Sequence, residues 1–322
     1  MLLPDHEFIK PTTLAETLAT LTAADGEIKI LGGGTDVVFN MRGRLFQPDV
    51  LLSIKDLPEL QAVVIAADGA LHIGAGCRLT DLERHAELRL WPGLVAAVSA
   101  VASRHVRNMA TLGGNLCLDT RCWYVNQSAE WRAAKGPCMK TGRDHCHAIK
   151  TSPVCVALNA SDIAPALIAL DATIHLASAG GERDLPLADF YTDDGADHTV
   201  RRDDEIMIAV TVPAACGPMT YIKETARKGN DFAYGTIAAH LAPAGGARIV
   251  IGALTGRPSL LLEPARIVNE QGLDDAAIEA AVEATRGELG ALTNLYTPAA
   301  YKTALARGLV RSALLRLREQ AA

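Results

Sequence analysis

The chain of 322 residues carries 31 lysines and arginines against 37 aspartates and glutamates, and only 4% of its residues are aromatic. A weakly acidic chain with few aromatic rings lacks the basic surface and the stacking residues of a general nucleic-acid binder. At roughly 100–200 residues per domain, the length predicts two or three domains, with a core large enough to fold without disulfides.

Neither membrane insertion nor secretion is predicted. No run of about 18 uncharged apolar residues occurs, which argues against a transmembrane helix. The first residues, MLLPDHEFIKPTT, lack the basic and then apolar pattern of a signal peptide. We therefore expect a cytoplasmic protein that binds neither nucleic acid nor membrane. The seven cysteines are an odd number, and metal binding or redox chemistry is the expected use of several of them.

Regular elements follow one another along the first third of the chain. Helices are predicted where apolar residues recur at helical spacing, and strands where short apolar runs end at turn residues. The predicted helices are residues 13–24, one beginning within 37–40, 80–86 and 91–101, and the predicted strands are residues 27–31, 50–54 and 70–75. Turns rich in glycine fall at residues 32–36 and 111–116.

Periodicity is absent between residues 117 and 155, where charged, aromatic and small residues mix. A loop of this length inside a compact domain is uncommon and usually functional. A helix at 161–170 and strands at 173–177 and 203–213 follow. Residues 214–218 have the composition of a linker, so we place a domain boundary near 213–219. Beyond it we predict strands at 221–223, 237–241 and 248–254, then helices at 274–286 and 298–319.

The two glycine turns are candidate binding loops. Consecutive glycines allow positive φ and close approach of the backbone, and exposed amides can form a nest for a pyrophosphate. The first turn is not a P-loop, because no Gly-Lys-Ser/Thr follows, and it is not G-x-G-x-x-G, because Val37 stands at the last glycine position. Two such turns about 75 residues apart could hold one long phosphorylated ligand from two sides. A tight turn without a ligand is the alternative interpretation.

Four segments in combination identify a family resemblance. They are ILGGGTD at residues 30–36, RNMATLGGN at 107–115, SDIAPALIALD at 161–171 and DEIMIAVTVP at 204–213. In order and spacing they resemble the flavin subunit of molybdenum hydroxylases, the xanthine dehydrogenase and carbon monoxide dehydrogenase family. The resemblance implies an α+β fold. Residues 1–215 would form an FAD-binding domain of the vanillyl-alcohol oxidase or PCMH type, with two α/β subdomains that divide near residue 56. Residues 216–322 would form a smaller α+β domain.

The same resemblance implies where FAD would bind, between the two subdomains. Backbone amides of the two turns, with the hydroxyls of Thr35 and Thr111, would hold the pyrophosphate. Asp162 would bind a polar part of the cofactor, Met207 would pack on the isoalloxazine, and Lys223 would approach it from the second domain, with Val101 before the second turn. Taken without the family, Asp162 reads as a helix N-cap, Met207 as core and Lys223 as a surface lysine. The implied FAD-binding residues are Lys29, Ile30, Leu31, Gly32, Gly33, Gly34, Thr35, Asp36, Val101, Thr111, Leu112, Gly113, Gly114, Asn115, Asp162, Met207 and Lys223.

An insertion of 45 residues separates Asn115 from Ser161 and contains Cys122, Cys138, Cys146 and Cys155. Gaps of 15, 7 and 8 residues fit neither a ferredoxin pattern nor a zinc ribbon. Four thiolates match the ligand count of a [4Fe-4S] cluster, which would close a loop too weakly patterned to fold on its own core. Structural zinc on three cysteines with a histidine, or no metal at all, stays open on spacing alone.

Other residues of the insertion have secondary roles in these alternatives. His145 and His147 are the candidate zinc-binding histidines, and Cys117 is a possible substitute ligand. The side chains expected to shield the sulfurs from water are Trp123, Trp131 and Met139. The remaining cysteines, Cys77 and Cys216, are expected to be buried apolar fillers.

The flanks DTRC at residues 119–122 and SAEWR at 128–132 make the insertion resemble that of the flavin subunit of 4-hydroxybenzoyl-CoA reductase. The resemblance implies that the four cysteines bind a [4Fe-4S] cluster. It implies two partners, a molybdopterin-binding large subunit and a small [2Fe-2S] subunit, in a dimer of heterotrimers. Electrons from a ferredoxin-type donor would pass through this chain to the reductive dehydroxylation of an aromatic acyl-CoA.

Two further functions remain as alternatives. One is the FAD subunit of an oxidative hydroxylase of the xanthine or carbon monoxide type, in which electrons leave to NAD or quinone. The other is a flavin-free scaffold whose insertion is a docking loop stapled by zinc. No G-x-S-x-G elbow and no H-E-x-x-H motif occurs, so hydrolytic chemistry is not predicted.

Overall fold

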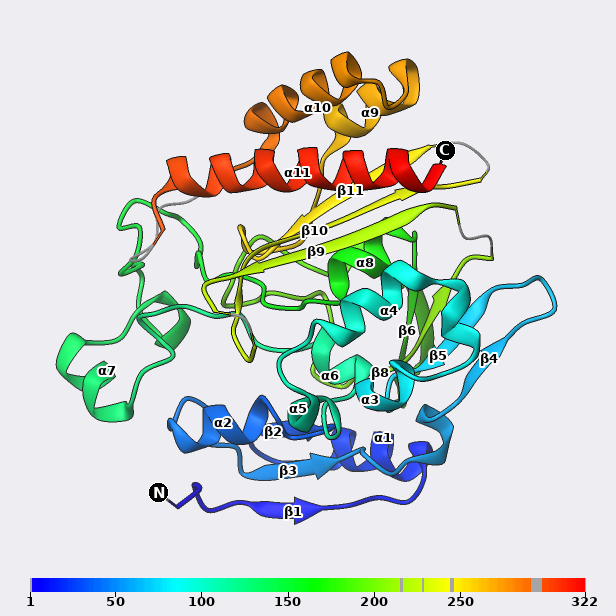
Figure 1. Ribbon diagram of the computed structural model, residues 1–322. Coiled ribbons are helices and arrows are strands. Elements are labelled where there is room, and N and C mark those ends of the chain that lie inside the picture. The colour runs from blue at the N-terminus through cyan, green and yellow to red at the C-terminus, as the bar shows by residue number, and fades with distance from the viewer. Residues whose placement is uncertain (1, 215–216, 228, 244–245, 291–296, 322) are drawn as a thin grey trace.

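The computed structural model describes residues 2–214, 217–227, 229–243, 246–290 and 297–321. These residues form three sheets, with helices packed against them and one excursion of the chain that projects to the side (Figure 1). None of the helices in this part of the chain is long and apolar enough to cross a bilayer.

The first sheet is parallel and has the order β1-β3-β2. Its elements are β1 (Glu7–Ile9), α1 (Leu14–Ala23), β2 (Ile28–Leu31), α2 (Val37–Arg42) and β3 (Val50–Ser53). Parallel strands need crossover connections: α1 lies between β1 and β2, which flank β3, and α2 lies between the neighbours β2 and β3. The first glycine turn therefore follows the carboxyl end of β2 and precedes α2, the edge at which open parallel sheets bind ligands.

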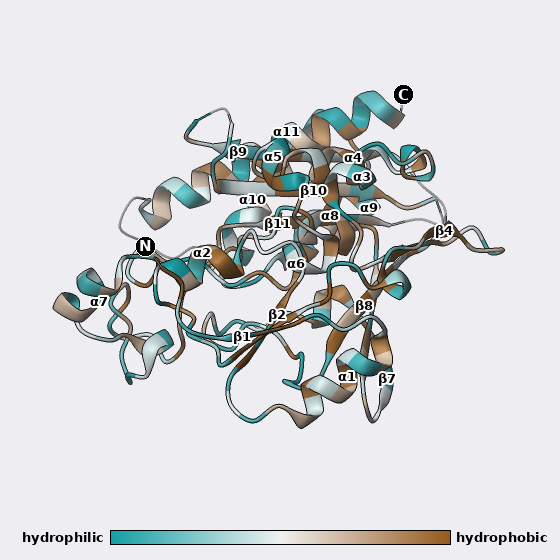
Figure 2. Ribbon diagram, turned by 90° about the horizontal axis from the view of Figure 1, so that it is seen from below, coloured by the Kyte–Doolittle hydropathy of each residue, from teal (hydrophilic) through white to brown (hydrophobic). Residues whose placement is uncertain are grey.

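The second sheet is antiparallel, in the order β4-β5-β8-β6-β7. Its strands are β4 (Val63–Ile65), β5 (Leu71–Gly74), β6 (Thr173–Ser178), β7 (Gly181–Pro186) and β8 (Ile206–Val212). Apart from α7 of the insertion, the α-helices between β5 and β6 are α3 (Leu79–Leu82), α4 (Pro92–Ser99), α5 (Arg104–Arg107), α6 (Leu112–Leu116) and α8 (Ala164–Ala169). Strand β8 is hydrophobic along most of its length and contributes to the main core (Figure 2).

The third sheet is also antiparallel, in the order β12-β11-β10-β9. Its elements are β9 (Met219–Thr225), β10 (Ala233–Leu241), β11 (Ala247–Gly252), β12 (Ser259–Leu260), α9 (Leu262–Gln271), α10 (Asp275–Glu288) and α11 (Ala299–Ala321). Helix α11 lies along β9 and β10, and α9 and α10 pack with it (Figure 1). Helices α4 and α8 also contact the third sheet, so this sheet packs directly on helices of the segment between β5 and β6.

The insertion holds more regular structure than the sequence indicates. It contains α7 (Ala129–Lys135) and a 3-10 turn at Met139–Thr141. The Ser128 hydroxyl caps α7 by accepting from the Trp131 amide at 3.2 Å. The Arg132 guanidinium donates to the carbonyls of Gly43 and Arg44, at 2.8 and 2.9 Å. These contacts with the first subdomain fix the helix, and the local sequence pattern could not show them.

Several other predicted elements differ from the structure. The helix predicted at 80–86 is a single turn, α3, after which the chain turns through 3-10 geometry. Strands β1, β4 and β7 and helix α9 were not predicted. β1 and β4 have three residues each, which is too short for a periodic signal, and β7 alternates exposed and half-buried residues. The turn predicted at 111–116 is the helix α6.

Candidate functional site

The two glycine turns lie against each other. A Cβ atom on Gly33 would stand 1.8 Å from the Met109 carbonyl oxygen, and one on Gly32 would stand 2.7 Å from the Thr111 hydroxyl oxygen. Gly34 has a φ of +74°, a conformation that side chains rarely adopt. The close approach of the two turns requires glycine at positions 32 and 33, and it places the two turns side by side.

The second turn is held by the second sheet. Thr111 caps α6 by accepting from the Gly114 amide at 3.1 Å. The Gly113 amide donates to the Ala75 carbonyl at 2.8 Å, and a Cβ on Gly113 would stand 2.8 Å from that of Ala75. Because Thr111 uses one lone pair on Gly114, its hydroxyl hydrogen remains available to donate to an anion.

Asn115 connects the second turn to Asp162. Its side-chain oxygen accepts from the Ser161 hydroxyl at 2.8 Å. Asp162 is buried, and Lys223 on β9 donates to its Oδ2 at 2.8 Å and to the Ala100 carbonyl at 3.0 Å. Burial raises the pKa of Asp162 to about 6, although the charge of Lys223 acts in the opposite direction. The structure thus brings these three predicted residues together, with Lys223 joining the third sheet to Asp162 and to the end of α4.

The remaining predicted FAD-binding residues fall into three groups. Val101 and Met207 are buried in the main core that also contains Leu112. On β2, Ile30 packs on the small core of the first sheet, while the Lys29 ammonium lies 3.3 Å from Glu27. Leu31 is half-buried at the end of that strand. At the end of the first turn, Thr35 is exposed and Asp36 is half-buried.

Asp36 also joins the first turn to the insertion. Its carboxylate forms an ion pair with Arg121 and accepts from the Asp119 amide at 3.4 Å. The Arg121 guanidinium lies between the rings of Phe39 and Phe232, 5.6 and 5.1 Å from their centroids. Burial lowers the pKa of Arg121 to about 10. Segments next to the first and the third sheet therefore meet at the residue just before Cys122.

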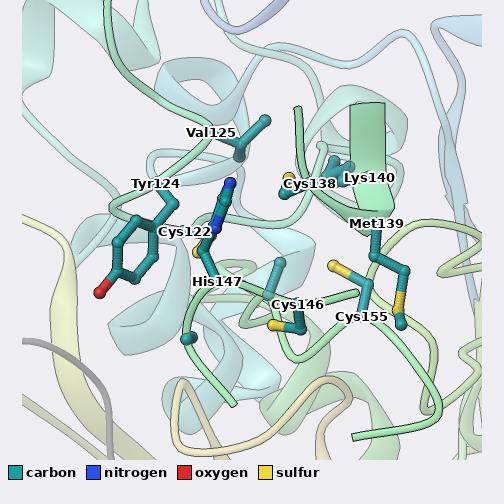
Figure 3. A pocket seen from close by; sticks show the side chains of 11 residues that line it. Cys122, Tyr124, Val125, Cys138, Met139, Lys140, Cys146, His147 and Cys155 are labelled. Atoms are coloured by element: carbon teal, nitrogen blue, oxygen red, sulfur yellow. The ribbon is translucent and has the colours of Figure 1, made fainter. Parts of the chain in front are cut away.

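The four cysteines predicted to bind metal line one cavity, which they enter from separate segments of the insertion (Figure 3). The cavity is lined by Cys122, Tyr124, Val125, Cys138, Met139, Lys140, Cys146, His147, Ala148, Cys155 and Ala157. Burial raises the pKa of the Cys155 thiol to about 11, with Lys140 acting against it, and also raises that of Cys122. Thiolates here therefore need a bound cation to offset their desolvation.

Not all of the expected neighbours are at this cavity. Met139 and His147 line it as predicted, but Cys117 and His145 do not. The prediction that tryptophans shield the sulfurs is wrong, because Trp123 and Trp131 are 42% and 36% exposed and lie outside the lining. Cys77 is buried in the main core, as expected of an apolar filler, and Cys216 lies outside the described residues. Among the described residues, no three His, Cys, Asp or Glu side chains stand in the arrangement of ligands to one metal ion.

Sequence analysis missed three residues that the structure places at or next to the cavity. Lys140 lines it, and Asp119 and Thr120 bind the Lys140 ammonium from behind. Gly195, 55 residues further along the chain, supplies a third contact through its carbonyl at 2.8 Å. A single lysine between two cysteines carries no periodic or motif signal, so its role emerges only from tertiary contacts.

Two family profiles together match almost the whole chain. The FAD binding domain in molybdopterin dehydrogenase matches residues 4–215, and the CO dehydrogenase flavoprotein C-terminal domain matches residues 220–317. The aldehyde oxidoreductase FAD-binding subunit PaoB of Escherichia coli is 33% identical over 241 residues, 71% of this chain and 76% of that subunit. The nicotinate dehydrogenase FAD-subunit of Eubacterium barkeri is 31% identical over 229 residues, 70% of this chain and 64% of that subunit.

The architecture is similar to that of solved relatives. A chain of carbon monoxide dehydrogenase from Hydrogenophaga pseudoflava superposes with a TM-score of 0.80 at 23% identity, covering 100% of both chains. This likeness and the two profiles confirm the predicted α+β fold, with an FAD-binding domain followed by a C-terminal domain. The chain therefore belongs to the FAD-binding subunits of the xanthine dehydrogenase and molybdenum hydroxylase family, of the carbon monoxide dehydrogenase medium-chain type.

Proposed function

We propose that this chain is the FAD- and [4Fe-4S]-containing electron-transfer subunit of a molybdenum enzyme of the 4-hydroxybenzoyl-CoA reductase type. The observation that carries the proposal is the convergence of Cys122, Cys138, Cys146 and Cys155 on one cavity. Four thiols match the ligand set of a [4Fe-4S] cluster in number and in softness. Zinc on the same thiols would close the loop equally well, but it has no redox chemistry to add beside a flavin.

The two glycine turns are the proposed pyrophosphate site. Backbone amides of residues 32–36 and of the first turn of α6 would face the phosphate oxygens, with the Thr35 and Thr111 hydroxyls as further donors. Gly32 and Gly33 contribute by their lack of a side chain, since any Cβ there would push the turns apart. The residues fit a dinucleotide because they present several donors, and the one carboxylate of the first turn, Asp36, is paired with Arg121.

Asp162 and Lys223 are the proposed polar contacts of the flavin. Lys223 occupies Oδ2 of the carboxylate, so Oδ1 is the acceptor that we assign to a hydroxyl or ring N–H of the cofactor. Because Lys223 comes from β9, cofactor binding here would join the FAD-binding domain to the C-terminal domain. Met207 and Val101 would border the ring from the core, and no proton transfer by either is needed.

Partner chains would complete the enzyme. The relatives include proteins named as FAD-binding subunits, medium subunits and medium chains, which supports a complex with other subunits. We propose a molybdopterin-binding large subunit and a small [2Fe-2S] subunit, assembled as a dimer of heterotrimers in the cytoplasm. When bound, FAD and the cluster supply two-electron and one-electron carriers, between a ferredoxin-type donor and a partner that dehydroxylates an aromatic acyl-CoA.

A second candidate function is favoured by the names of the relatives. Proteins similar to this chain include a nicotinate dehydrogenase subunit and a carbon monoxide dehydrogenase chain. This chain would then be the FAD subunit of an oxidative enzyme that passes electrons out to NAD or quinone. The cysteine cavity is the feature that such an enzyme has no evident need for.

The experiment is a cofactor analysis of the full chain purified without oxygen. Iron, acid-labile sulfide, zinc and FAD are measured per chain. About four irons, four sulfides and one FAD are expected for a [4Fe-4S] flavoprotein. FAD with one zinc and no sulfide would refute the cluster and leave the oxidative candidate. Absence of FAD after incubation with excess cofactor would refute the flavin site itself.

The two candidate enzymes are then distinguished on the complex isolated with its partners. In the reductase, a reduced ferredoxin should support loss of the ring hydroxyl of 4-hydroxybenzoyl-CoA, and NAD should not be reduced. An oxidative enzyme would instead reduce NAD or a quinone when given a hydroxylatable substrate. Reduction of NAD without turnover of the acyl-CoA would overturn the first assignment.

A further inference from the structure

Lys140 is buried at the wall of the cysteine cavity. Its side chain is 8% exposed, and it follows Cys138 by two residues. The ammonium donates to the Asp119 carboxylate at 2.5 Å, to the Gly195 carbonyl at 2.8 Å and to the Thr120 hydroxyl. Each of its three hydrogens therefore has an acceptor, and the charge is fixed in place beside the thiols.

Lys140 is the positively charged residue of the cavity lining. Among the residues that line the cavity, it is the one side chain that carries a permanent positive charge. The neighbouring Arg121 is turned to Asp36, and Arg132 is turned to backbone carbonyls of the first subdomain. Neither of these arginines lines the cavity.

Asp119 pairs with the lysine through one of its two carboxylate oxygens. One carboxylate oxygen binds Lys140, and within the described residues the other is buried without a hydrogen-bond partner. His198 lies 4.0 Å from the first oxygen, and burial lowers its pKa, so it adds no charge at neutral pH. An ion pair thus stands beside the cavity, and of its two residues Lys140 lines the cavity and Asp119 does not.

We propose that Lys140 and Asp119 set the reduction potential of the iron–sulfur cluster assigned to this cavity, with opposite signs. The inference rests on the proposed function, because it requires the cluster. A nearby cation stabilises the cluster form that carries one more electron, and an anion destabilises it. The low dielectric of a buried site strengthens both effects. Lys140 is accordingly a positioning and tuning residue rather than a ligand.

The test is a redox titration of the cluster followed by electron paramagnetic resonance, on the full chain purified without oxygen. Lys140→Met should lower the equilibrium constant for reduction by about tenfold, a shift of about 59 mV to more negative potential for one electron. Asp119→Asn should move the potential in the positive direction. Lys140→Arg should restore a value near wild type. Lys150→Met is the matched control, an exposed lysine of the same insertion, and should leave the potential unchanged.

The opposite signs separate tuning from a merely structural role. Shifts in the same direction for Lys140→Met and Asp119→Asn, or none in either, would overturn the proposal. If Lys140→Met fails to assemble the cluster, the potentials of Asp119→Asn and Lys140→Arg test the proposal instead. An unshifted potential in Asp119→Asn then overturns the proposal. A wild-type chain without iron and sulfide would overturn the proposed cluster and this inference together. A wild-type cluster with unresponsive variants would overturn the inference alone.

Discussion

Arg121 and Asp36 form an ion pair that joins the residue preceding Cys122 to the last residue of the first glycine turn. The pair spans 85 positions of sequence and is largely shielded from solvent. It ties the proposed metal site to the proposed flavin site through one side chain on each. Each of the two sites therefore depends on a contact from the other.

The first prediction concerns this pair. Asp36→Asn leaves the buried Arg121 guanidinium without its counter-charge, which should lower the free energy of unfolding by about 1–3 kcal/mol. Urea denaturation measures the change. The control is Asp144→Asn, because the Asp144 side chain is 97% exposed and its replacement should stay within about 0.5 kcal/mol of wild type. Equal stability of the two variants would show that the pair contributes nothing.

Gly33 tests the contact between the two turns. Gly33→Ala places a methyl group where only 1.8 Å separates it from the Met109 carbonyl oxygen, so the backbone must move. We expect the FAD content of the purified chain to fall at least tenfold, measured by flavin absorbance. Gly308→Ala is the control, since a Cβ there meets open space on α11, and it should gain about 0.5–1 kcal/mol of stability. A fully flavinylated Gly33→Ala variant would remove this turn from the site.

Two cysteines of the insertion are expected to behave differently. Cys138→Ala removes a thiol that lines the cavity and should lose iron and sulfide while FAD stays bound. Cys117→Ala removes a thiol that packs on the main core away from the cavity, and its iron content should match wild type. Iron and sulfide analysis of both variants is the measurement. Full iron in Cys138→Ala would falsify its role as a ligand.

Asp162 should make stability depend on pH in a defined window. Burial raises its pKa from an ordinary value of 3.8 to about 6 in the folded chain, so between these pH values the folded state retains a proton that the unfolded state has lost. The free energy of unfolding of the wild type, compared with that of Asp162→Asn, is therefore highest below pH 3.8. This difference falls as pH rises through about 6, by of the order of 2–3 kcal/mol. Chemical denaturation of the FAD-free chain from pH 4 to 7 tests the sign. A stability difference that rises over this window would contradict the assignment.

Local sequence was sufficient for many elements because their signals are local. Residues 13–24 and 298–319 show helical periodicity, and α1 and α11 form there. Strands β2, β3, β5 and β8 follow apolar runs bounded by turn residues, and these runs need no distant partner to be recognised. Through residue type alone, the seven cysteines likewise indicated metal binding or redox chemistry, and the two glycine turns indicated anion binding.

The tertiary structure decided what depends on contacts between distant residues. Only the fold brings Gly33 against Met109, Lys223 of β9 to Asp162, and four cysteines spaced like neither a ferredoxin nor a zinc ribbon to one cavity. Lys140 had no signal at all, because its importance lies in the burial of a charge between Asp119 and Gly195. Residue identity therefore determined which chemistry this chain can perform. The packing of separate segments decided which side chains share a site, since proximity across long loops leaves no periodic trace.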